Sequence, residues 1–361
     1  MTAITIKDVA KRADVSISTV SNVLNGTKYV DDELVKRVKI AVKELNYQAD
    51  PIARNMRTKY TKTIGVIAAD ICGLFYPYVL KGVYSVAMEQ GYNVTVFDTG
   101  TARDATLSAY AKEIEAFGIF AGNRVDGVIF GSMVPEEVEQ AYINEVKGIV
   151  HSKREIVLTS IERDFSHVGI DSIFADSFEG AMKATNYLIG LNCKRIGHIT
   201  GPLEYKNIQD RLRGYKVAME EAGLYMDDST MVASGDYTHQ SGYFAMKKLL
   251  SSMPDIDSVF VANDQMAIGA CKALSEYEKN IPLDVKVIGY DDVFVSSVIE
   301  PSLSTIHVNK YRLGVEATKA LINRIQRGSQ SETLRMELET RLVVRKSTET
   351  DVSPDWILSE W

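Results

Sequence analysis

The chain has 361 residues, of which 45% are hydrophobic and 25% are charged, and its formal net charge is −7. This composition excludes a disordered chain and leaves room for two or three globular domains. No apolar run approaches the roughly 18 residues that a membrane helix needs. The opening MTAITIKDVAKR has no apolar signal core, so we expect a cytoplasmic protein with no membrane partner. Three widely spaced cysteines, Cys72, Cys193 and Cys271, lack CxxC or metal-ligand spacing, so we expect reduced thiols, no metal and no cofactor.

The first 25 residues predict two short helices around a tight turn. Thr5 and Asp8 can form a capping pair for the first helix, and Ser16 can cap the second. A third helix follows Asp31 as its cap. Apolar residues at helical spacing give all three helices an inward face, so the segment is a helix-turn-helix with its own small core. These inward residues are Val9, Ala10 and Ala13, then Val20, Val23 and Leu24, then Leu34, Val38, Ala41, Val42 and Leu45.

The free face of the second helix has the character of a DNA-reading surface. At about 100° per residue, Ser18 and Asn22 point almost directly away from the core and Ile17 lies at its margin. A helix in the major groove carries short polar side chains at such positions. The alternatives are an ordinary solvated face for Ser18 and Asn22 and an extended core for Ile17. Charge favours DNA, because residues 1–62 hold twelve Lys/Arg against seven Asp/Glu, a net of +5, and the remaining residues therefore carry −12.

Residues 50–57, DPIARNMR, form a basic segment that is too short to be a stable helix alone. Held by DNA, the segment could fold on binding. Met56 would then be an apolar wedge in the minor groove, with Arg54 and Arg57 on phosphates. The alternative is a plain basic linker.

The rest of the chain alternates apolar strands with amphipathic helices, such as those expected at residues 78–90 and 180–190. This rhythm predicts an α/β fold of parallel sheets joined by right-handed crossovers and covered on both faces. Ligands in such sheets bind beyond the carboxyl ends of the strands. The clearest strands are residues 63–69, 92–98, 125–131, 155–161, 194–201, 258–264 and 285–292.

Polar and aromatic residues follow several of these strands. An Arg fork, an amide and a carboxylate beside aromatic faces suit a polyhydroxylated ligand such as a sugar. Each residue taken alone could equally be a helix cap or a surface turn. The candidate ligand-binding residues are Asp70, Phe75, Tyr76, Arg211, Tyr237, Asn263 and Asp291.

The ordered motifs resemble those of the lactose-repressor family of bacterial transcription regulators (LacI/GalR), from Thr5 to about Lys346. They include IKDVAKRADVSISTVSNVLNG, ELNY followed by ARNM, TKTIGVI, GP with RLRGY, SGDY, VANDQMAIGA, VIGYDD and PSLSTIHV. The resemblance implies a homodimer that reads an operator with two-fold symmetry through headpieces and hinge helices. It also implies a periplasmic-binding-protein-like core of two doubly wound parallel-sheet lobes, with a small-molecule effector between them.

By motif, Ile17, Ser18 and Asn22 fall on the family's base-reading positions, and Met56 falls where a Leu wedge is usual. Arg211, Asn263 and Asp291 fall on effector-hydroxyl positions, Tyr237 on an aromatic residue that covers the ligand, and Phe75 and Tyr76 on an aromatic pair. The full set of candidate DNA contacts is Thr5, Ser16, Ile17, Ser18, Thr19, Ser21, Asn22, Asn25, Tyr47, Ala53, Arg54, Met56 and Arg57.

The sequence departs from the family pattern at several places. Asp14 stands where a left-handed Gly is common, and Gly73-Leu74 replaces the usual Asn-Pro. Residues 117–124, AFGIFAGN, resemble a longer loop than usual, and the tail lacks the heptads of a coiled coil. We expect a headpiece at 1–49, a hinge at 50–62, a core at 63–347 and a tail at 348–361. Within the core, one lobe is expected at 63–168 with 294–324 and the other at 169–293 with 325–347.

Other functional classes fit less well. A free solute-binding protein of a transport system would share the core but has no use for a helix-turn-helix. An enzyme is disfavoured because the five His are scattered and no HExxH, GxSxG, Walker or GxGxxG motif occurs. A purine effector stays open, since the aromatic pair could stack a base, but Tyr205 stands where a purine reader would need a cationic or small polar residue. We therefore expect a regulator, most simply a repressor, that responds to a sugar or glycoside.

Overall fold

The computed structural model describes residues 4–25, 28–47, 60–101, 108–152, 155–328 and 332–352. They belong to two compact units that divide between Thr61 and Lys62. The first unit, the headpiece, contains the three predicted helices, α1 (Ile6–Ala13), α2 (Ile17–Asn25) and α3 (Asp32–Glu44). Its core is built from the expected apolar face: Val9, Ala10, Ala13, Val20, Val38 and Ala41.

One residue of the predicted headpiece core is misplaced. Leu24 was expected to face inward, but its side chain is 38% exposed. Burial decreases along α2 from fully buried Val20 through half-buried Val23 to Leu24, because the small core ends before the last turn of the helix.

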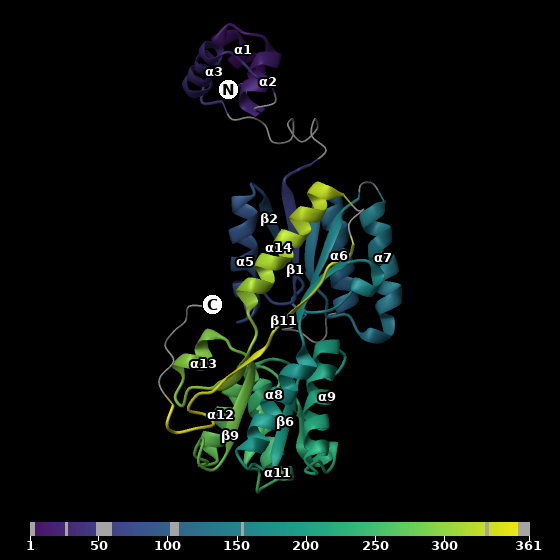
Figure 1. Ribbon diagram of the computed structural model, residues 1–361, viewed down its shortest axis with the longest axis vertical. Helices are drawn as coiled ribbons and strands as arrows, with labels where there is room; N and C mark the ends of the chain where they lie inside the picture. Colours follow the sequence, from purple (N-terminus) through teal and green to yellow (C-terminus); the bar gives the residue numbers. More distant parts are fainter. Residues whose placement is uncertain are drawn as a thin grey trace. The chain divides into compact units, whose positions relative to one another are not determined.

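The second unit is the core, and it contains two six-stranded sheets (Figure 1). The first sheet has the order β11-β5-β4-β3-β1-β2 and only parallel pairs. Its strands are β1 (Thr63–Ala68), β2 (Asn93–Asp98), β3 (Gly127–Gly131), β4 (Val157–Ile161), β5 (Asp171–Ala175) and β11 (Arg335–Leu338). We call this sheet and its helices lobe 1: α5 (Tyr76–Glu89), α6 (Ala109–Gly122), α7 (Glu139–His151) and α14 (Lys310–Arg327), with the short turns η1 (Glu136–Val138) and η2 (Ser166–Val168).

The second sheet has the order β12-β10-β9-β8-β6-β7 and is parallel except for β12, which pairs antiparallel with β10. Its strands are β6 (Ile196–Thr200), β7 (Val232–Ser234), β8 (Ser258–Val261), β9 (Lys286–Asp291), β10 (Ser304–His307) and β12 (Arg341–Val343). The helices of this lobe 2 are α8 (Ser177–Gly190), α9 (Lys206–Glu221), α10 (Asp228–Met231), α11 (His239–Ser252), α12 (Asp264–Glu276) and α13 (Phe294–Val298). The predicted α/β fold with two parallel-sheet lobes is confirmed.

Helices α5 and α14 pack closely on each other in lobe 1. A Cβ atom on Gly82 would lie 2.1 Å from the carbonyl oxygen of Tyr311, and one on Gly314 would lie 2.0 Å from that of Val79. Glycine is therefore required at both positions, because only a residue without a side chain lets the two backbones approach so closely. This contact fixes the start of α14 against α5, the helix that follows the first strand.

The expected division of the core between its lobes is wrong at three places. Strand β5 pairs with β4, so the first crossing between lobes follows residue 175 and not 168. Strand β10 pairs with β9 in lobe 2, which places the second crossing at residues 308–309 and not at 293. Strand β11 pairs with β5, so the third crossing follows residue 338 and not 324. The first and third boundaries follow from the Asp171 carboxylate, which binds the Arg324 guanidinium at 2.5 and 2.6 Å and the backbone N–H of Leu334 at 2.7 Å, and so ties β5 to late segments of lobe 1. The second follows from the pairing of β10 with β9.

Two further expectations fail. Residues 117–122 of the expected long loop belong to α6, because Phe117 and Phe120 are buried and the Phe120 ring packs over Gly65 of β1. The free energy gained by burying two aromatic rings exceeds the cost of about 1 kcal/mol for each glycine in the helix. The core also extends past residue 347, because the Thr348 hydroxyl lies 2.6 Å from that of Ser304 in β10. Residues 353–361 of the expected tail lie outside the described residues.

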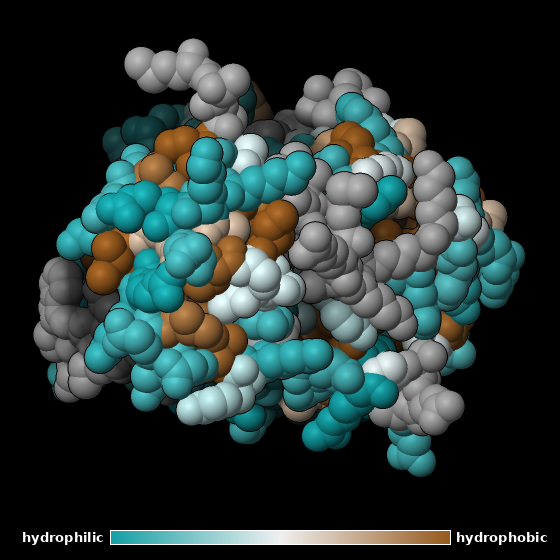
Figure 2. Space-filling view, turned by 90° about the horizontal axis from the view of Figure 1, so that it is seen from above, coloured by the Kyte–Doolittle hydropathy of each residue, from teal (hydrophilic) through white to brown (hydrophobic). Residues whose placement is uncertain are grey.

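The surface is consistent with a chain that carries many charges. In the view of Figure 2, hydrophobic residues form separate patches among hydrophilic ones. Within the described residues, no helix combines the length and the apolar character that crossing a membrane requires.

His198 of β6 is a buried histidine with a structural role in lobe 2. Its ring stacks between those of Tyr215 and Phe260, with centroids 4.9 and 4.8 Å away, and its Nδ1–H donates to the Phe260 carbonyl at 2.9 Å. Burial lowers the pKa of His198 to about 3 from an ordinary value of 6.5. Between these values the unfolded chain binds a proton that the folded chain does not, so this histidine makes stability fall as the pH drops below 6.5.

We expect His198→Phe to remove this acid sensitivity while keeping a stacked ring. Between pH 7.5 and 5.5 the parent should lose about 1.4 kcal/mol of unfolding free energy relative to the variant, which is one pKa unit of linkage. Urea unfolding of both proteins at the two pH values measures the difference. The contributions of the other titrating groups are the same in both proteins and cancel. If the parent and the variant differ in unfolding free energy by the same amount at both pH values, His198 is not the source of the acid sensitivity.

Candidate functional site

The turn between α1 and α2 is stabilised as the sequence predicts. The backbone N–H and the hydroxyl of Thr5 both donate to the Asp8 carboxylate at 2.8 Å, and the Ser16 hydroxyl accepts from the Thr19 N–H at 3.0 Å. Asp14 adopts the expected left-handed conformation, with φ 52° and ψ 53°. Arg37 of α3 donates to the carbonyls of Ala13 and Asp14 at 2.6 and 2.8 Å, so it satisfies carbonyls at the end of α1.

The expected reading face of α2 is open at its start. Ser16 and Ser18 are exposed, and Ile17 is 39% exposed, so Ile17 does not extend the core. Thr19, Ser21 and Asn22 are half-buried. Of the other candidate DNA contacts, Thr5 is exposed at the start of α1 and Tyr47 is half-buried against the headpiece core. The side chain of Asn25 and the hinge candidates Ala53, Arg54, Met56 and Arg57 lie outside the described residues.

The left-handed Asp14 should cost stability that glycine would recover. Asp14→Gly removes a strained conformation worth about 1–2 kcal/mol, and it loses only the ion pair with Arg37, in which the Asp14 side chain is 98% exposed. We expect slower hydrogen exchange across α1 and α2 in the Gly variant and faster exchange in Asp14→Val. Equal exchange in Asp14→Gly and Asp14→Val would show that the conformation carries no cost.

The seven predicted ligand-binding residues all line one pocket, of about 760 Å³ when its space open to solvent is included. Asp70, Phe75 and Tyr76 come from the segment after β1 of lobe 1. Arg211, Tyr237, Asn263 and Asp291 come from lobe 2. The structure therefore brings residues up to 221 positions apart in the sequence to a single cavity between the lobes.

Arg211 is the only cation among the described residues that line this pocket. Its Nη1 donates to the Ala262 carbonyl, its Nη2 lies 3.6 Å from the Asp291 carboxylate, and the centroid of the Tyr290 ring lies 3.7 Å from the guanidinium carbon. Its Nε and the Tyr237 hydroxyl are buried atoms without a partner. Unsatisfied donors in a pocket wall are the groups that a ligand oxygen can pair.

Asn263 and Asp291 are held by the ends of their elements. Asn263 caps α12, accepting from the Met266 N–H at 2.9 Å and donating to the Tyr237 carbonyl at 3.2 Å. Asp291 has φ 103° and Asp292 has φ 54°, so the chain turns sharply after β9. The ammonium of buried Lys310 bridges the carbonyls of Asp291, Asp292 and Val308, the latter two at 3.0 and 3.1 Å. Burial raises the pKa of Asp291, whereas the charges of Arg211 and Lys310 lower it.

Glu162 is a pocket residue that the sequence analysis missed. It directly follows β4, and its carboxylate accepts a 2.5 Å hydrogen bond from the Tyr76 hydroxyl. Burial raises the pKa of Glu162 to about 7; the Tyr76 bond and Arg211 act in the opposite direction, and the Asp291 charge adds to the rise. Its position after a predicted strand is the signal that could have found it. Met133, Asn207, Thr238 and Gln265 also line the pocket and were not predicted.

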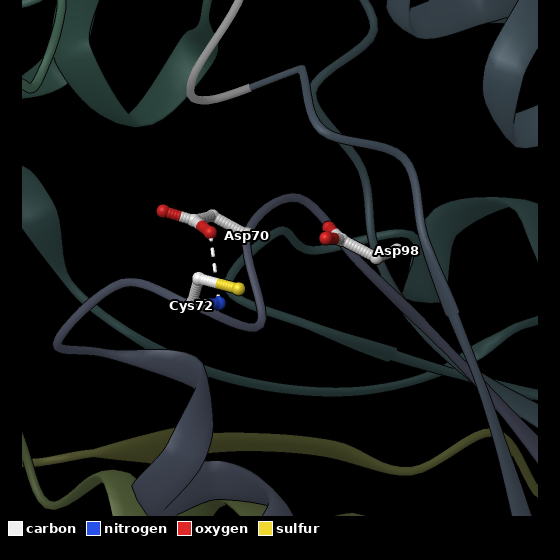
Figure 3. Close-up of side chains that lie close together, drawn as sticks. All are labelled: Asp70, Cys72 and Asp98. Atoms are coloured by element: carbon white, nitrogen blue, oxygen red, sulfur yellow. Dashed lines mark hydrogen bonds between the residues drawn. The ribbon is translucent and has the colours of Figure 1, made fainter.

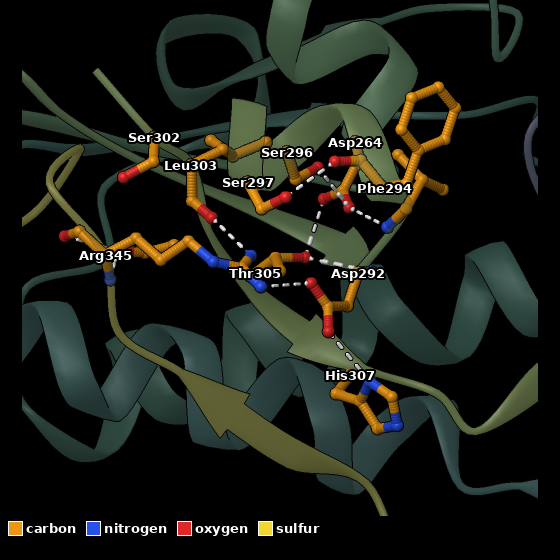
Figure 4. A network of polar contacts seen from close by, with 12 residues as sticks. Asp264, Asp292, Phe294, Ser296, Ser297, Ser302, Leu303, Thr305, His307 and Arg345 are labelled. Atoms are coloured by element: carbon orange, nitrogen blue, oxygen red, sulfur yellow. Dashed lines mark hydrogen bonds and ion pairs between the residues drawn. The ribbon is translucent and has the colours of Figure 1, made fainter. Parts of the chain in front are cut away.

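Asp292 faces away from the ligand side of this turn. It binds His307 and Arg345, each at 2.8 Å, within a buried polar network that includes Asp264 (Figure 4). Asp264 accepts from the Thr305 hydroxyl at 2.6 Å and the Val293 N–H at 2.9 Å, and burial raises its pKa to about 7. Of the two adjacent carboxylates, only Asp291 therefore serves the pocket.

Asp70, Cys72 and Asp98 lie close together beside the pocket (Figure 3). One ligand atom of each falls within 4.8 Å of the others. The Asp70 carboxylate already accepts from the Cys72 N–H at 2.9 Å, and the Cys72 side chain is exposed, so the cluster is that of a surface turn.

Known proteins match both units. Residues 5–50 match the family described as bacterial regulatory proteins, lacI family, and residues 185–348 match a periplasmic binding protein-like domain. The chain is 34% identical over 344 residues to the HTH-type transcriptional repressor PurR of Salmonella arizonae, covering 95% of this chain and 96% of that protein. The chain belongs to the LacI family. It is a DNA-binding transcriptional regulator with an effector-binding core.

Solved structures support the same assignment. The lac repressor dimer bound to operator and the anti-inducer ONPF has a TM-score of 0.84 and 25% identity, covering 96% of this chain and 99% of that one. A complex of the transcriptional regulator CelR with cellobiose has a TM-score of 0.68 and 29% identity, covering 95% and 99%. These relatives are transcription regulators and not enzymes.

Proposed function

We propose that this LacI-family regulator is a homodimeric repressor whose operator affinity is controlled by a sugar or glycoside. The observation that carries the ligand class is the pocket lining, which joins Arg211, Asn263 and Asp291 of lobe 2 with Phe75 and Tyr76 of lobe 1. Polar groups of this kind pair sugar hydroxyls, and aromatic rings cover the C–H face of a sugar. The cellobiose held by the similar regulator CelR supports the same class.

Tyr205 favours a saccharide over a purine. Its ring stacks on that of Tyr237, with centroids 6.2 Å apart and planes 16° apart. Tyr205 thus supports the ring of Tyr237 from outside the pocket lining, and its phenol has no cation or amide for the polar edge of a base.

A dimer is supported by apolar side chains left at the surface of the core. Tyr84 and Met88, one turn apart on α5, are 42% and 69% exposed, and Leu283 of the segment after α12 is 75% exposed. Such side chains lose unfavourable contact with water when a second copy covers them. The related lac repressor structure is a dimer on its operator.

Effector binding and operator binding are coupled if the effector has different affinities for different closures of the two lobes. A ligand that binds one closure of the lobes more tightly shifts the population towards it. Because the first strand of lobe 1 continues from the hinge segment, closure also changes the spacing of the two hinges in a dimer and thereby operator affinity. We propose that residues 50–57 fold on DNA, with Met56 in the minor groove and Arg54 and Arg57 on phosphates.

Asn22 should read a base in each operator half-site. Asn pairs bidentately with adenine, so Asn22→Ala should cost about 1–3 kcal/mol at one base pair and relax preference there. Selection of operators from a random pool, with the parent and the variant, gives the two sequence preferences. Recovery of one and the same preference would remove Asn22 from the reading face.

Arg211 should be needed for the response and not for DNA binding. Arg211→Ala leaves the headpiece unchanged, so we expect normal operator affinity and a loss of about 1.5–3 kcal/mol in effector binding, the value of a charge-assisted hydrogen bond. Operator binding is titrated with the effector found in a thermal-shift screen of sugars. A variant that responds at the parent's effector concentration would take Arg211 out of the site.

A further inference from the structure

The described residues that line the pocket include three carboxyl groups and one cation. The carboxyl groups belong to Asp70, Glu162 and Asp291, the cation is Arg211, and the other described lining residues are uncharged. We propose that the effector is an uncharged saccharide, that the pocket rejects the phosphate ester of the same sugar, and that Glu162 sets this selection. The inference rests on the proposed function, in which this pocket binds a saccharide.

Arg211 is already engaged and is poorly placed to balance a phosphate. Its Nη1 is bound to the Ala262 carbonyl, its Nη2 faces Asp291, and its plane lies on Tyr290, which leaves Nε as the free donor. A phosphate ester carries about −1.5 to −2 charges at neutral pH. Arginine binds phosphate best through two parallel N–H donors, and that fork is not open here.

Among the helices that begin at the pocket, α12 offers little to an anion. Phosphate often binds at helix N-termini because free backbone N–H groups point at it. At the start of α12 the Asn263 side chain accepts from the Met266 N–H at 2.9 Å, and the Asp264 carboxylate lies in the first turn. A capped N-terminus with an acidic first residue disfavours a second negative group.

Among the three carboxyl groups, Glu162 has the least compensation. Asp291 lies beside Arg211 and below the Lys310 ammonium, and Asp70 accepts a backbone N–H. Glu162 forms no ion pair with the described Lys, Arg or His residues, and its hydrogen bond comes from the neutral Tyr76 hydroxyl. Arg211 acts on the Glu162 charge from a distance, without a direct ion pair. A negative charge brought near Glu162 would therefore meet a carboxylate whose charge is offset only in part.

The fold reserves the space for this carboxylate. A Cβ atom on Gly131, at the end of β3, would lie 2.4 Å from the Tyr76 hydroxyl oxygen and 2.8 Å from Glu162 Oε2. Glu162 itself has φ 66°, a left-handed conformation that costs free energy in a residue other than glycine. With a pKa near 7, Glu162 is largely ionised at pH 8, where it repels anions most.

The test compares matched pairs of ligands at pH 8. Thermal shift and calorimetry are run on the full chain with glucose, ribose, trehalose and cellobiose, with the phosphate esters of the first three, and with hypoxanthine and inosine monophosphate. Glu162→Gln keeps an acceptor for Tyr76 and removes the charge. Glu179→Gln on α8, outside the pocket lining, is the control with the same change in net charge.

We expect an uncharged saccharide to stabilise the parent and its ester to bind at least tenfold more weakly. Glu162→Gln should reduce the ratio of the ester's dissociation constant to the sugar's at least tenfold, whereas Glu179→Gln should leave this ratio unchanged. Equal thermal stability of the unliganded parent and Glu162→Gln proteins shows that the variant folds. An unstable Glu162→Gln is replaced in the comparison by Glu162→Gly at the same pH, which also removes the charge and suits the left-handed backbone at this position. The same fall in the preference against the ester is expected.

Other results overturn the inference. If the parent binds a phosphate ester as tightly as the corresponding sugar, the proposed selection is wrong but the saccharide function stands. The same conclusion follows if Glu162→Gln leaves the ratio of ester to sugar dissociation constants unchanged. Binding of hypoxanthine alone would reject the saccharide function, and binding of inosine monophosphate would reject both. Absence of a shift with every ligand also counts against both.

Discussion

The position of the Asp291 carboxylate depends on one buried ammonium group. Two successive residues, Asp291 and Asp292, have left-handed backbones, each of which costs about 1–3 kcal/mol. Lys310 donates to both of their carbonyls and to that of Val308, so the three protons of the ammonium are used on the turn that presents Asp291. Lys310 is also the first residue of α14, the helix that returns to lobe 1. The position of the carboxylate that faces Arg211 therefore depends on Lys310, the residue at which the chain starts to return to lobe 1.

Local features of this chain could be predicted because they depend on neighbours in the sequence. The capping pair of Thr5 and Asp8 and the cap at Ser16 join residues three apart, and the seven pocket residues follow strands that the apolar pattern identifies. Glu162 escaped because Arg163 and Asp164 follow it, which makes the segment resemble an ordinary polar turn. What distinguishes Glu162 is the Tyr76 hydroxyl, 86 positions earlier in the chain.

The errors in the lobe boundaries and in the expected loop share a physical cause, which is contact between distant segments. The lobe boundaries depend on the Asp171 and Arg324 pair, 153 positions apart, on β11 joining the edge of the first sheet beside β5, and on β10 pairing with β9. Residues 117–122 carry two glycines that favour a loop, yet Phe117 and Phe120 become part of the lobe 1 core once β1 and α6 pack. Neither outcome can be obtained from composition or periodicity, because both are decided by packing partners that the local sequence does not contain.

The return of the chain to lobe 1 has a consequence for synthesis on the ribosome. Lobe 1 has five of its strands by Ala175, but α14, whose Leu313, Ala317, Leu321 and Ile325 are buried in its core, ends only at Arg327. About 150 residues separate these points, which at 5–20 residues per second takes about 8–30 s. During that interval the first sheet lacks α14, the helix that packs on β3, β4 and β5. The headpiece, a compact unit that ends at Thr61, needs nothing further along the chain. The nascent regulator therefore has a folded headpiece well before it has a complete effector pocket.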